Sequence, residues 1–207
     1  MKFAIWLLTL LLATSTFAEE VMHARDYYPL TVGSTWTMEL VGPQGKAELI
    51  NTIEGVDKIN EKELIRLTGS INGTVIATEH LEITDKGITR NQFNGGPITP
   101  PIVLLSEPIE LGKTFTEKEV KMGSDTMSVE VKVAEKLEKV KSPAGEFEAV
   151  HVTVTAKPAE GQVVSDYWFA KGVGVVKQEL QLGDVSVTTK LKSYEIAKEE
   201  AEKEEAE

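Results

Sequence analysis

Residues 62–84, which read KELIRLTGSI, NG and TVIATEHLEIT, decide the fold class. The segments 62–71 and 74–84 alternate apolar and polar side chains, the period-2 pattern of a half-buried strand. Asn72 and Gly73 stand between them, and both tolerate the positive φ angles of a type I′ turn. The stretch therefore predicts a β-hairpin. Asn72-Gly73-Thr74 also matches an N-glycosylation acceptor, but the turn is a sufficient explanation for these residues.

The same alternation recurs along most of the chain. A proline-rich segment, 98–108, interrupts it, and proline cannot donate to a strand ladder, so we expect an extended segment there that is not a central strand. Residues 139–142 could form a short helix. Besides the first hairpin, strands are expected over residues 35–41, 46–56, 88–93, 114–121, 126–137, 146–156, 163–170, 173–182 and 185–196.

About eleven antiparallel strands predict an all-β protein, a meander curled into an open or half barrel. Flat open sheets of that size are uncommon. A sandwich of two sheets is the alternative. A curled sheet can enclose more space than its own side chains fill, and small ligands favour concave, mainly apolar sites. The sequence leaves open whether the interior is hollow or packed.

The N-terminus has the pattern of an export signal. Lys2 precedes the apolar run 3–12, and the small residues Thr16 and Ala18 stand at the −3 and −1 positions of a cleavage site. We expect a signal peptide over 1–18, an N-terminal lead-in over 19–33 and a β-barrel-like domain over 34–196. The run is shorter than the roughly 20 residues of a spanning helix, although an uncleaved anchor is the alternative. A periplasmic or secreted protein follows, with no transmembrane span in the mature chain.

An acidic tail is expected over 197–207. Residues 195–207 hold seven Glu and two Lys, and Ala, Glu and Lys favour helices, but no apolar stripe accompanies them. The tail is expected to be helical and short, or disordered. Docking to a basic protein partner is the functional alternative.

The net charge and the cysteine content exclude several classes of binding partner, metal site and covalent modification. The net charge is −11, which opposes binding to nucleic acid or to anionic lipid headgroups. The chain has no cysteine, so disulfides, thiolate metal sites, a cysteine nucleophile and a lipid-modified N-terminal cysteine are excluded. We therefore expect a protein that is not lipid-anchored.

A search for catalytic and metal-binding motifs finds little. The three histidines, 23, 80 and 151, lack metal-ligand spacing, and no G-x-S-x-G occurs. His80 and Glu82 share a strand face and could make half a metal site, but a solvated face is the simpler interpretation. Gly172-Val173-Gly174 precedes a strand-like segment rather than a helix, which favours a tight turn over a phosphate loop. We expect no catalytic residue, no metal and no cofactor.

The aromatic residues are the best ligand-binding candidates. Tyr28, Trp36 and Trp168 each combine an apolar body with a hydrogen-bonding tip, which suits the mouth of a pocket or a corner of the core. Core packing is the alternative role. Alternation places Tyr167 and Phe169 on one face of a strand and Trp168 on the other, so these residues cannot all line one cavity.

Three segments together resemble a known group. They are YYPLTVGSTW at 27–36, SPAGEF at 142–147 and YWFAKGVGVVK at 167–177. In this order they are similar to secreted bacterial proteins of unknown function called the TapB-like group. The resemblance implies a fold like the open β-barrels of lipoprotein carriers and lipid-binding envelope proteins, and it implies no catalytic residues. Many members carry a lipoprotein cysteine, which this sequence lacks.

These observations favour a non-enzymatic envelope protein that binds an apolar or amphipathic ligand, such as a lipid or an acyl chain. One alternative is a structural or protein-interaction module that uses a sheet edge and the acidic tail. The other is a hydrolase that uses carboxylates, although nothing in the sequence selects a particular acid pair.

Overall fold

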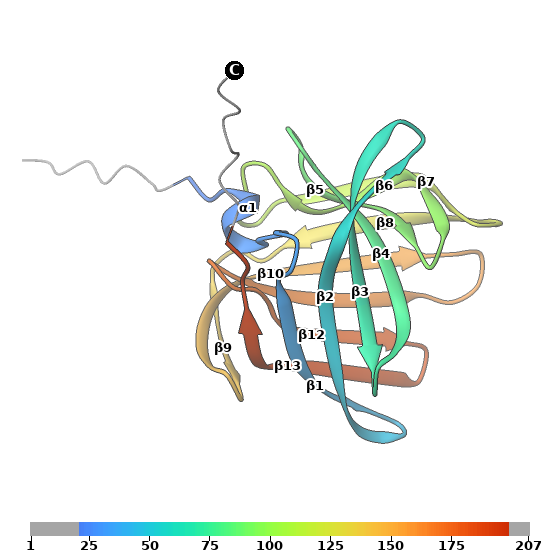
Figure 1. Ribbon diagram of the computed structural model, residues 1–207. Coiled ribbons are helices and arrows are strands. Elements are labelled where there is room, and N and C mark those ends of the chain that lie inside the picture. The colour runs from blue at the N-terminus through green and yellow to red at the C-terminus, as the bar shows by residue number, and fades with distance from the viewer. Residues whose placement is uncertain (1–20, 199–207) are drawn as a thin grey trace, which may run out of the picture.

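A computed structural model describes residues 21–198 as one curled antiparallel sheet with a short helix (Figure 1). The predicted signal peptide and most of the predicted tail lie outside these residues. The elements are α1 (Ala24–Tyr27), β1 (Thr35–Gly42), β2 (Gly45–Ile59), β3 (Lys62–Ile71), β4 (Thr74–Thr84), β5 (Gly87–Phe93), β6 (Gly96–Ser106), β7 (Thr114–Met122), β8 (Asp125–Val133), β9 (Glu138–Ser142), β10 (Gly145–Lys157), β11 (Val163–Ala170), β12 (Gly174–Leu182) and β13 (Val185–Glu195).

The sheet closes into a barrel of twelve strands. β10 makes the closure, because one of its edges pairs with β11 while its other edge pairs with β8 and, further toward its start, with β9. β9 is the thirteenth strand and stands outside the closed ring. The all-β class and the antiparallel meander are confirmed, but the open or half barrel is wrong. Among the described residues β9 pairs with β10 alone, so it keeps one unpaired edge, and the sheet-edge interaction module stays a prediction.

The first predicted hairpin is confirmed. β3 and β4 pair up to Ile71 and Thr74, and Asn72 and Gly73 have φ angles of 51° and 76°. The tight turn before β12 is also confirmed, since Gly172 and Gly174 have φ angles of 73° and 97°. Local turn chemistry therefore sets these connections.

The two additional strands fall where the sequence was ambiguous. β9 occupies the stretch that could have formed a helix. β6 takes a place between β5 and β7 despite its prolines, so the expectation for this segment is wrong. Its proline content still limits pairing: β6 pairs with β7 only at Ile98–Met122 and Thr99–Lys121, just before Pro100 and Pro101, which lack an N–H.

The two ends of the barrel differ. The turns that follow β1, β3, β5, β7, β10 and β12 form one end, here called the turn end. The other end, here called the helix end, carries α1 (Figure 1). The Gly172 N–H donates to the Asp26 carbonyl and the Ile109 N–H donates to the Met22 carbonyl, which fixes the lead-in against the barrel. The predicted lead-in is thus an integral plug of the helix end.

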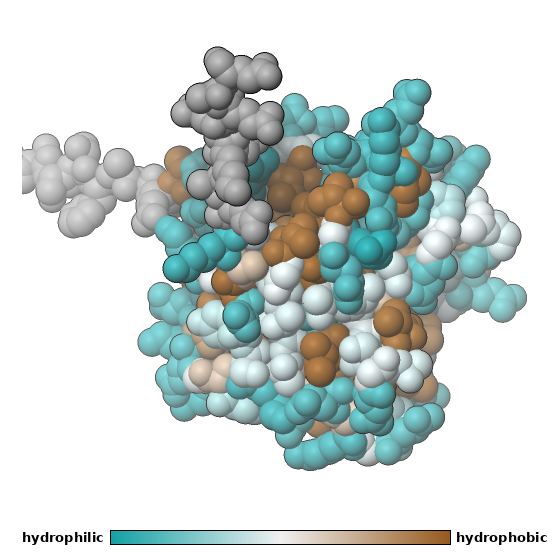
Figure 2. All heavy atoms as spheres, viewed as in Figure 1, coloured by the Kyte–Doolittle hydropathy of each residue, from teal (hydrophilic) through white to brown (hydrophobic). Residues whose placement is uncertain are grey.

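The middle of the barrel is packed with apolar side chains. Val150 and Val152 of β10 are fully buried, and they face inward with alternate residues of the neighbouring strands. On the face shown in Figure 2, the surface is mainly hydrophilic and hydrophobic residues form several small groups. Within residues 21–198, no helix has the length and hydrophobicity needed to cross a membrane.

Candidate functional site

A cavity of about 200 Å³ lies inside the barrel and is lined by residues of the helix-end plug, β1–β6, β11 and β12. We call it the barrel cavity. Its wall toward the turn end includes the apolar residues Leu49, Ile76, Ala77 and Phe93, and the polar side chains of Asn51 and Gln178 also line the cavity. Ile76 and Phe93 are 49% and 37% exposed, so apolar side chains meet solvent there.

Aromatic side chains form the floor of this cavity. The ring of Tyr28 lies 6.2 Å from that of Trp36 and 5.3 Å from that of Phe169. Trp36 donates its Nε1–H to the Val173 carbonyl. A Cβ on Gly174 would lie 3.2 Å from Trp36 Nε1, so glycine allows the indole to approach the β11–β12 turn closely.

A buried ion pair stands beside the aromatic floor. Arg90 Nε donates to Glu79 Oε2 at 2.7 Å, and Arg90 Nη2 donates to the Tyr167 hydroxyl at 3.1 Å. The Arg90 and Glu79 side chains are only 15% and 20% exposed. Burial alone would lower the pKa of Arg90, but the Glu79 carboxylate and the Tyr167 hydroxyl raise it above its ordinary value. Arg90 therefore stays charged within the cavity.

Tyr28 stays neutral at the same place. Burial, followed by the nearby Glu79 carboxylate, raises the pKa of the Tyr28 hydroxyl well above its ordinary value. A protonated hydroxyl can donate and accept one hydrogen bond. The floor therefore combines a net-neutral ion pair with the neutral hydroxyl of Tyr28.

The three predicted ligand-binding residues are not in one place. Tyr28 and Trp36 both line the barrel cavity. Trp168 lies on the strand face opposite to Tyr167 and Phe169, as the alternation predicted, and this face is the outside of the barrel. Its ring stacks 4.2 Å from that of His151, and Lys177 Nζ lies 3.9 Å above it. A ligand role for any of the three stays a prediction.

The sequence reasoning missed Glu79 and Arg90. Glu79 shares its parity along β4 with Ala77 and Leu81, and Arg90 shares its parity along β5 with Ile88. Charged residues at inward positions of two neighbouring strands were thus the available signal. Their pairing was hidden, because a register shift lies between His80 and Leu81.

Trp168 belongs to a polar cluster outside the barrel. His151 Nδ1 lies 3.1 Å from Glu138 Oε1 and His151 Nε2 lies 2.8 Å from Asp166 Oδ1. Trp168 donates to Glu138 Oε2 at 2.8 Å. Burial would raise the pKa of Glu138, but these hydrogen bonds and His151 hold it below its usual range. Both imidazole nitrogens are engaged, so the cluster fastens β9 to β10 and β11.

His80 is buried rather than solvated, which corrects the simpler interpretation of its strand face. It is 7% exposed, and its Nε2 lies 2.9 Å from Asp57 Oδ2, while Arg66 Nη1 contacts both Asp57 oxygens. Glu82 on the same face contacts Lys62 and Asn91 instead. In the part of the chain that the structure describes, no cluster of three or more His, Asp or Glu is arranged to hold a metal.

The Asp57 contacts predict a contribution to stability that depends on pH. The hydrogen bond from His80, followed by the charge of Arg66, holds the pKa of Asp57 below its ordinary value. A lowered pKa stabilises the fold above the unfolded-state pKa of about 4, and this stabilisation is lost as the pH falls through the folded-state value. In Asp57→Asn we expect a lower Tm at pH 6 and a smaller fall in Tm on acidification than in the wild type, measured by circular dichroism.

Asp184→Asn, in the exposed β12–β13 turn, is the control. Its Tm should fall on acidification by as much as that of the wild type. Equal pH slopes for Asp57→Asn and the wild type would contradict the assignment.

Comparisons with known proteins find similar solved structures and a matching family model. Two solved structures are similar: a proposed lipoprotein from Parabacteroides distasonis (TM-score 0.43, 11% identity, covering 86% of this chain and 100% of that one) and a proposed exported protein with a YmcC-like fold from Bacteroides fragilis (TM-score 0.41, 12% identity, covering 82% and 99%). No curated protein matches the sequence. Membership of the TapB-like group stays a prediction, as does the absence of a lipid anchor. The family that does match is the DUF3108-like family, whose model aligns with residues 95–191.

Proposed function

We propose that this protein is an exported barrel that binds a small apolar or amphipathic ligand in the barrel cavity, without catalysing a reaction on it. The observation that carries the proposal is the cavity itself, with apolar walls toward the turn end and the Arg90–Glu79–Tyr167 cluster at its floor. Such a combination of apolar lining and few polar groups is typical of ligand sites.

The floor suits an uncharged polar group. Arg90 and Glu79 neutralise each other, and the hydroxyls of Tyr28 and Tyr167 can form hydrogen bonds. A charged ligand group would lose its hydration there without gaining a free counter-charge. An alcohol, an ester or an amide end is therefore favoured over a carboxylate.

The size of the cavity limits what it holds. Its volume of about 200 Å³ is below the roughly 300–1,000 Å³ of a typical small-molecule pocket. Each buried methylene contributes about 0.8 kcal/mol, so a short chain or one end of a longer chain can bind. The remainder of a long chain would lie along the exposed Ile76 and Phe93 side chains.

Ala77→Leu tests the site by filling it. Ala77 lines the cavity, so three added carbons occupy the volume that the ligand needs. Calorimetric titration of the purified protein with 1-octanol should give saturable binding, which Ala77→Leu weakens by about tenfold or more, since a loss of two buried methylenes corresponds to that factor.

Thr116→Leu is the matched control, because Thr116 is exposed on β7 and does not line the cavity. Its affinity for 1-octanol should equal that of the wild type. Organic extraction of the purified protein followed by mass spectrometry identifies any ligand that copurifies. Wild-type affinity in Ala77→Leu, or no saturable binding at all, would refute the proposal.

A further inference from the structure

The barrel wall has an opening between β6 and β7. These strands pair at only two positions, whereas β7 and β8 pair at seven. Pairing stops at Pro100 and Pro101, which have no N–H to offer. Beyond them, residues 102–106 of β6 and 114–117 of β7 border a space that no ladder fills.

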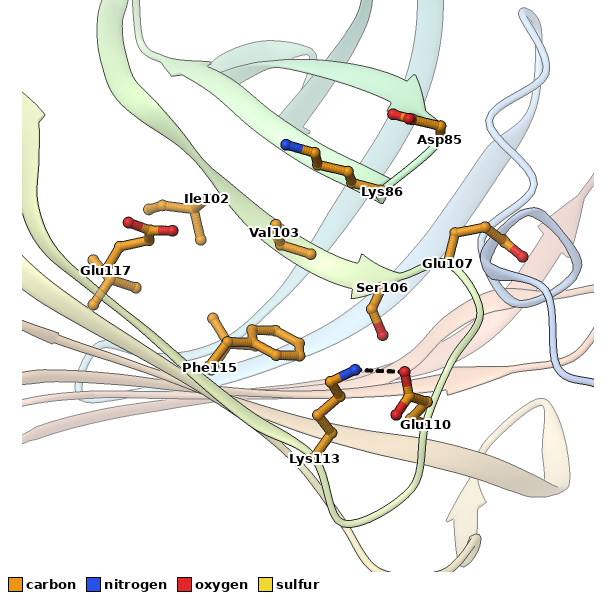
Figure 3. A pocket seen from close by; sticks show the side chains of 12 residues that line it. Asp85, Lys86, Ile102, Val103, Ser106, Glu107, Glu110, Lys113, Phe115 and Glu117 are labelled. Carbon is orange, nitrogen blue, oxygen red and sulfur yellow. Dashed lines mark hydrogen bonds and ion pairs between the residues drawn. The ribbon is translucent and has the colours of Figure 1, made fainter.

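This opening leads to a second pocket, of about 290 Å³, here called the side pocket (Figure 3). Its lining includes Val129 and Val131 of β8, which are 2% and 4% exposed and belong to the barrel core. Ile102 and Val103 of β6 and Phe115 of β7 lie around the opening. The aliphatic lining suits an alkyl chain that enters through the wall.

Charged groups surround the mouth of the side pocket, and most of them are acids. The acids are Asp85, Glu107, Glu110 and Glu117, and the bases are Lys86 and Lys113.

Some of these charges are already paired. Glu110 pairs with Lys113 (Figure 3), and Glu107 accepts from His23 and from the Ala24 N–H. Across residues 21–198, Asp85, Lys86 and Glu117 form no ion pair, which leaves two acids against one base.

We propose that the side pocket binds a single-chain amphiphile with a cationic amine head group. The alkyl chain lies against Val129, Val131 and Phe115, and the ammonium group lies at the mouth near Glu117, while Asp85 stands on the opposite side of the pocket and adds to the negative charge of the rim. An ammonium–carboxylate hydrogen bond is stronger than a neutral one, while a carboxylate head would meet a net negative rim on a protein of charge −11. This site is separate from the barrel cavity and does not depend on its function.

The test exploits the absence of cysteine from the chain. A single Ser106→Cys substitution at the pocket lip carries an environment-sensitive fluorophore, and Ser186→Cys, at the turn end, carries the same label as the control. Dodecylamine, 1-dodecanol and dodecanoate are titrated below their micelle concentrations. We expect a saturable signal at position 106 and none at 186, with dodecylamine binding tightest and dodecanoate weakest.

Two charge variants test the head group. Glu117→Gln should weaken dodecylamine binding by about twofold to fivefold, as the loss of an exposed ion pair would, and leave 1-dodecanol binding unchanged. Lys86→Ala should strengthen dodecylamine binding. Dodecanoate binding as tightly as dodecylamine, an unchanged amine affinity in Glu117→Gln, or equal signals at both labels would overturn the proposal.

The proposals for the two sites can be refuted independently of each other. Ala77→Leu should leave the signal at position 106 intact, and Glu117→Gln should leave 1-octanol binding in the barrel cavity intact. A loss of both by either variant would mean that one shared site exists, which overturns the side pocket as a separate site.

Discussion

Replacing Arg90 with methionine should lower the free energy of unfolding by about 3–5 kcal/mol, because it leaves the Glu79 carboxylate buried without its partner. Arg90 is the ion-pair partner of Glu79 in the described part of the chain and is also bonded to Tyr167. Methionine matches much of the arginine volume, so lost packing contributes little. Urea unfolding at neutral pH measures the effect: the urea concentration at the unfolding midpoint should fall, while the dependence of the unfolding free energy on urea (the m-value) stays unchanged.

The double variant Glu79→Leu/Arg90→Met is the control for this prediction. Removing both charges eliminates the unpaired carboxylate, and apolar replacement of a buried pair is often neutral or stabilising. We expect the double variant to recover most of the stability that Arg90→Met loses. A double variant as unstable as the single one would mean that the charges are not the cause.

The proposed function offers a reason for the costly burial of this ion pair in the barrel. Two apolar residues would pack the floor at least as well, yet charges stand where the cavity ends. The pair instead supplies fixed polar groups at the bottom of apolar walls. Under the proposed function, this arrangement would orient an amphipathic ligand with its polar end inward.

Local features of the fold could be predicted from the sequence. The Asn72-Gly73 turn depends only on two residues that tolerate positive φ, and the alternation around it fixes which side chains face inward. The opposite orientations of Tyr167 and Trp168 followed from the same period. These predictions hold because each depends on neighbours along the chain.

Closure could not be predicted, because it depends on pairing between distant segments. β10 has 13 residues, and it closes the barrel by dividing one edge between β8 and β9. Nothing in its alternation indicates that division. The strand at Gly96–Ser106 was missed for a related reason: its prolines weaken pairing with β7, but pairing with β5 still holds it in the wall.

The candidate site was predicted in part. Tyr28 and Trp36 were selected for their chemistry, and they meet because the lead-in folds into the helix end. Glu79 and Arg90 carry the electrostatics of the cavity and were missed, because acids on strands normally face solvent. An acidic residue at an inward strand position indicates a buried ion pair only when its basic partner is also identified. A register shift between the two strands prevents that partner from being identified in the sequence.

Replacing Phe169 with alanine should also cost about 3–5 kcal/mol of unfolding free energy. Phe169 is fully buried, and its ring packs 5.3 Å from that of Tyr28 and 5.8 Å from that of Tyr167. Because Phe169 lines the barrel cavity, the lost ring enlarges that cavity. Val152→Ala, equally buried but outside the cavity lining, is the comparison.

The shift in Tm on adding benzene then distinguishes Phe169→Ala from Val152→Ala. Apolar cavities that stay dry bind such ligands, and a ligand at one hundred times its Kd stabilises the folded state by about 2.7 kcal/mol. Thermal unfolding with and without benzene should show a larger rise in Tm for Phe169→Ala than for the wild type or Val152→Ala. Equal shifts in all three proteins would contradict a ligand-accessible barrel cavity. A larger shift in Phe169→Ala alone would show that the floor beneath Tyr28 is accessible to ligands, because benzene must reach the space that the ring has left.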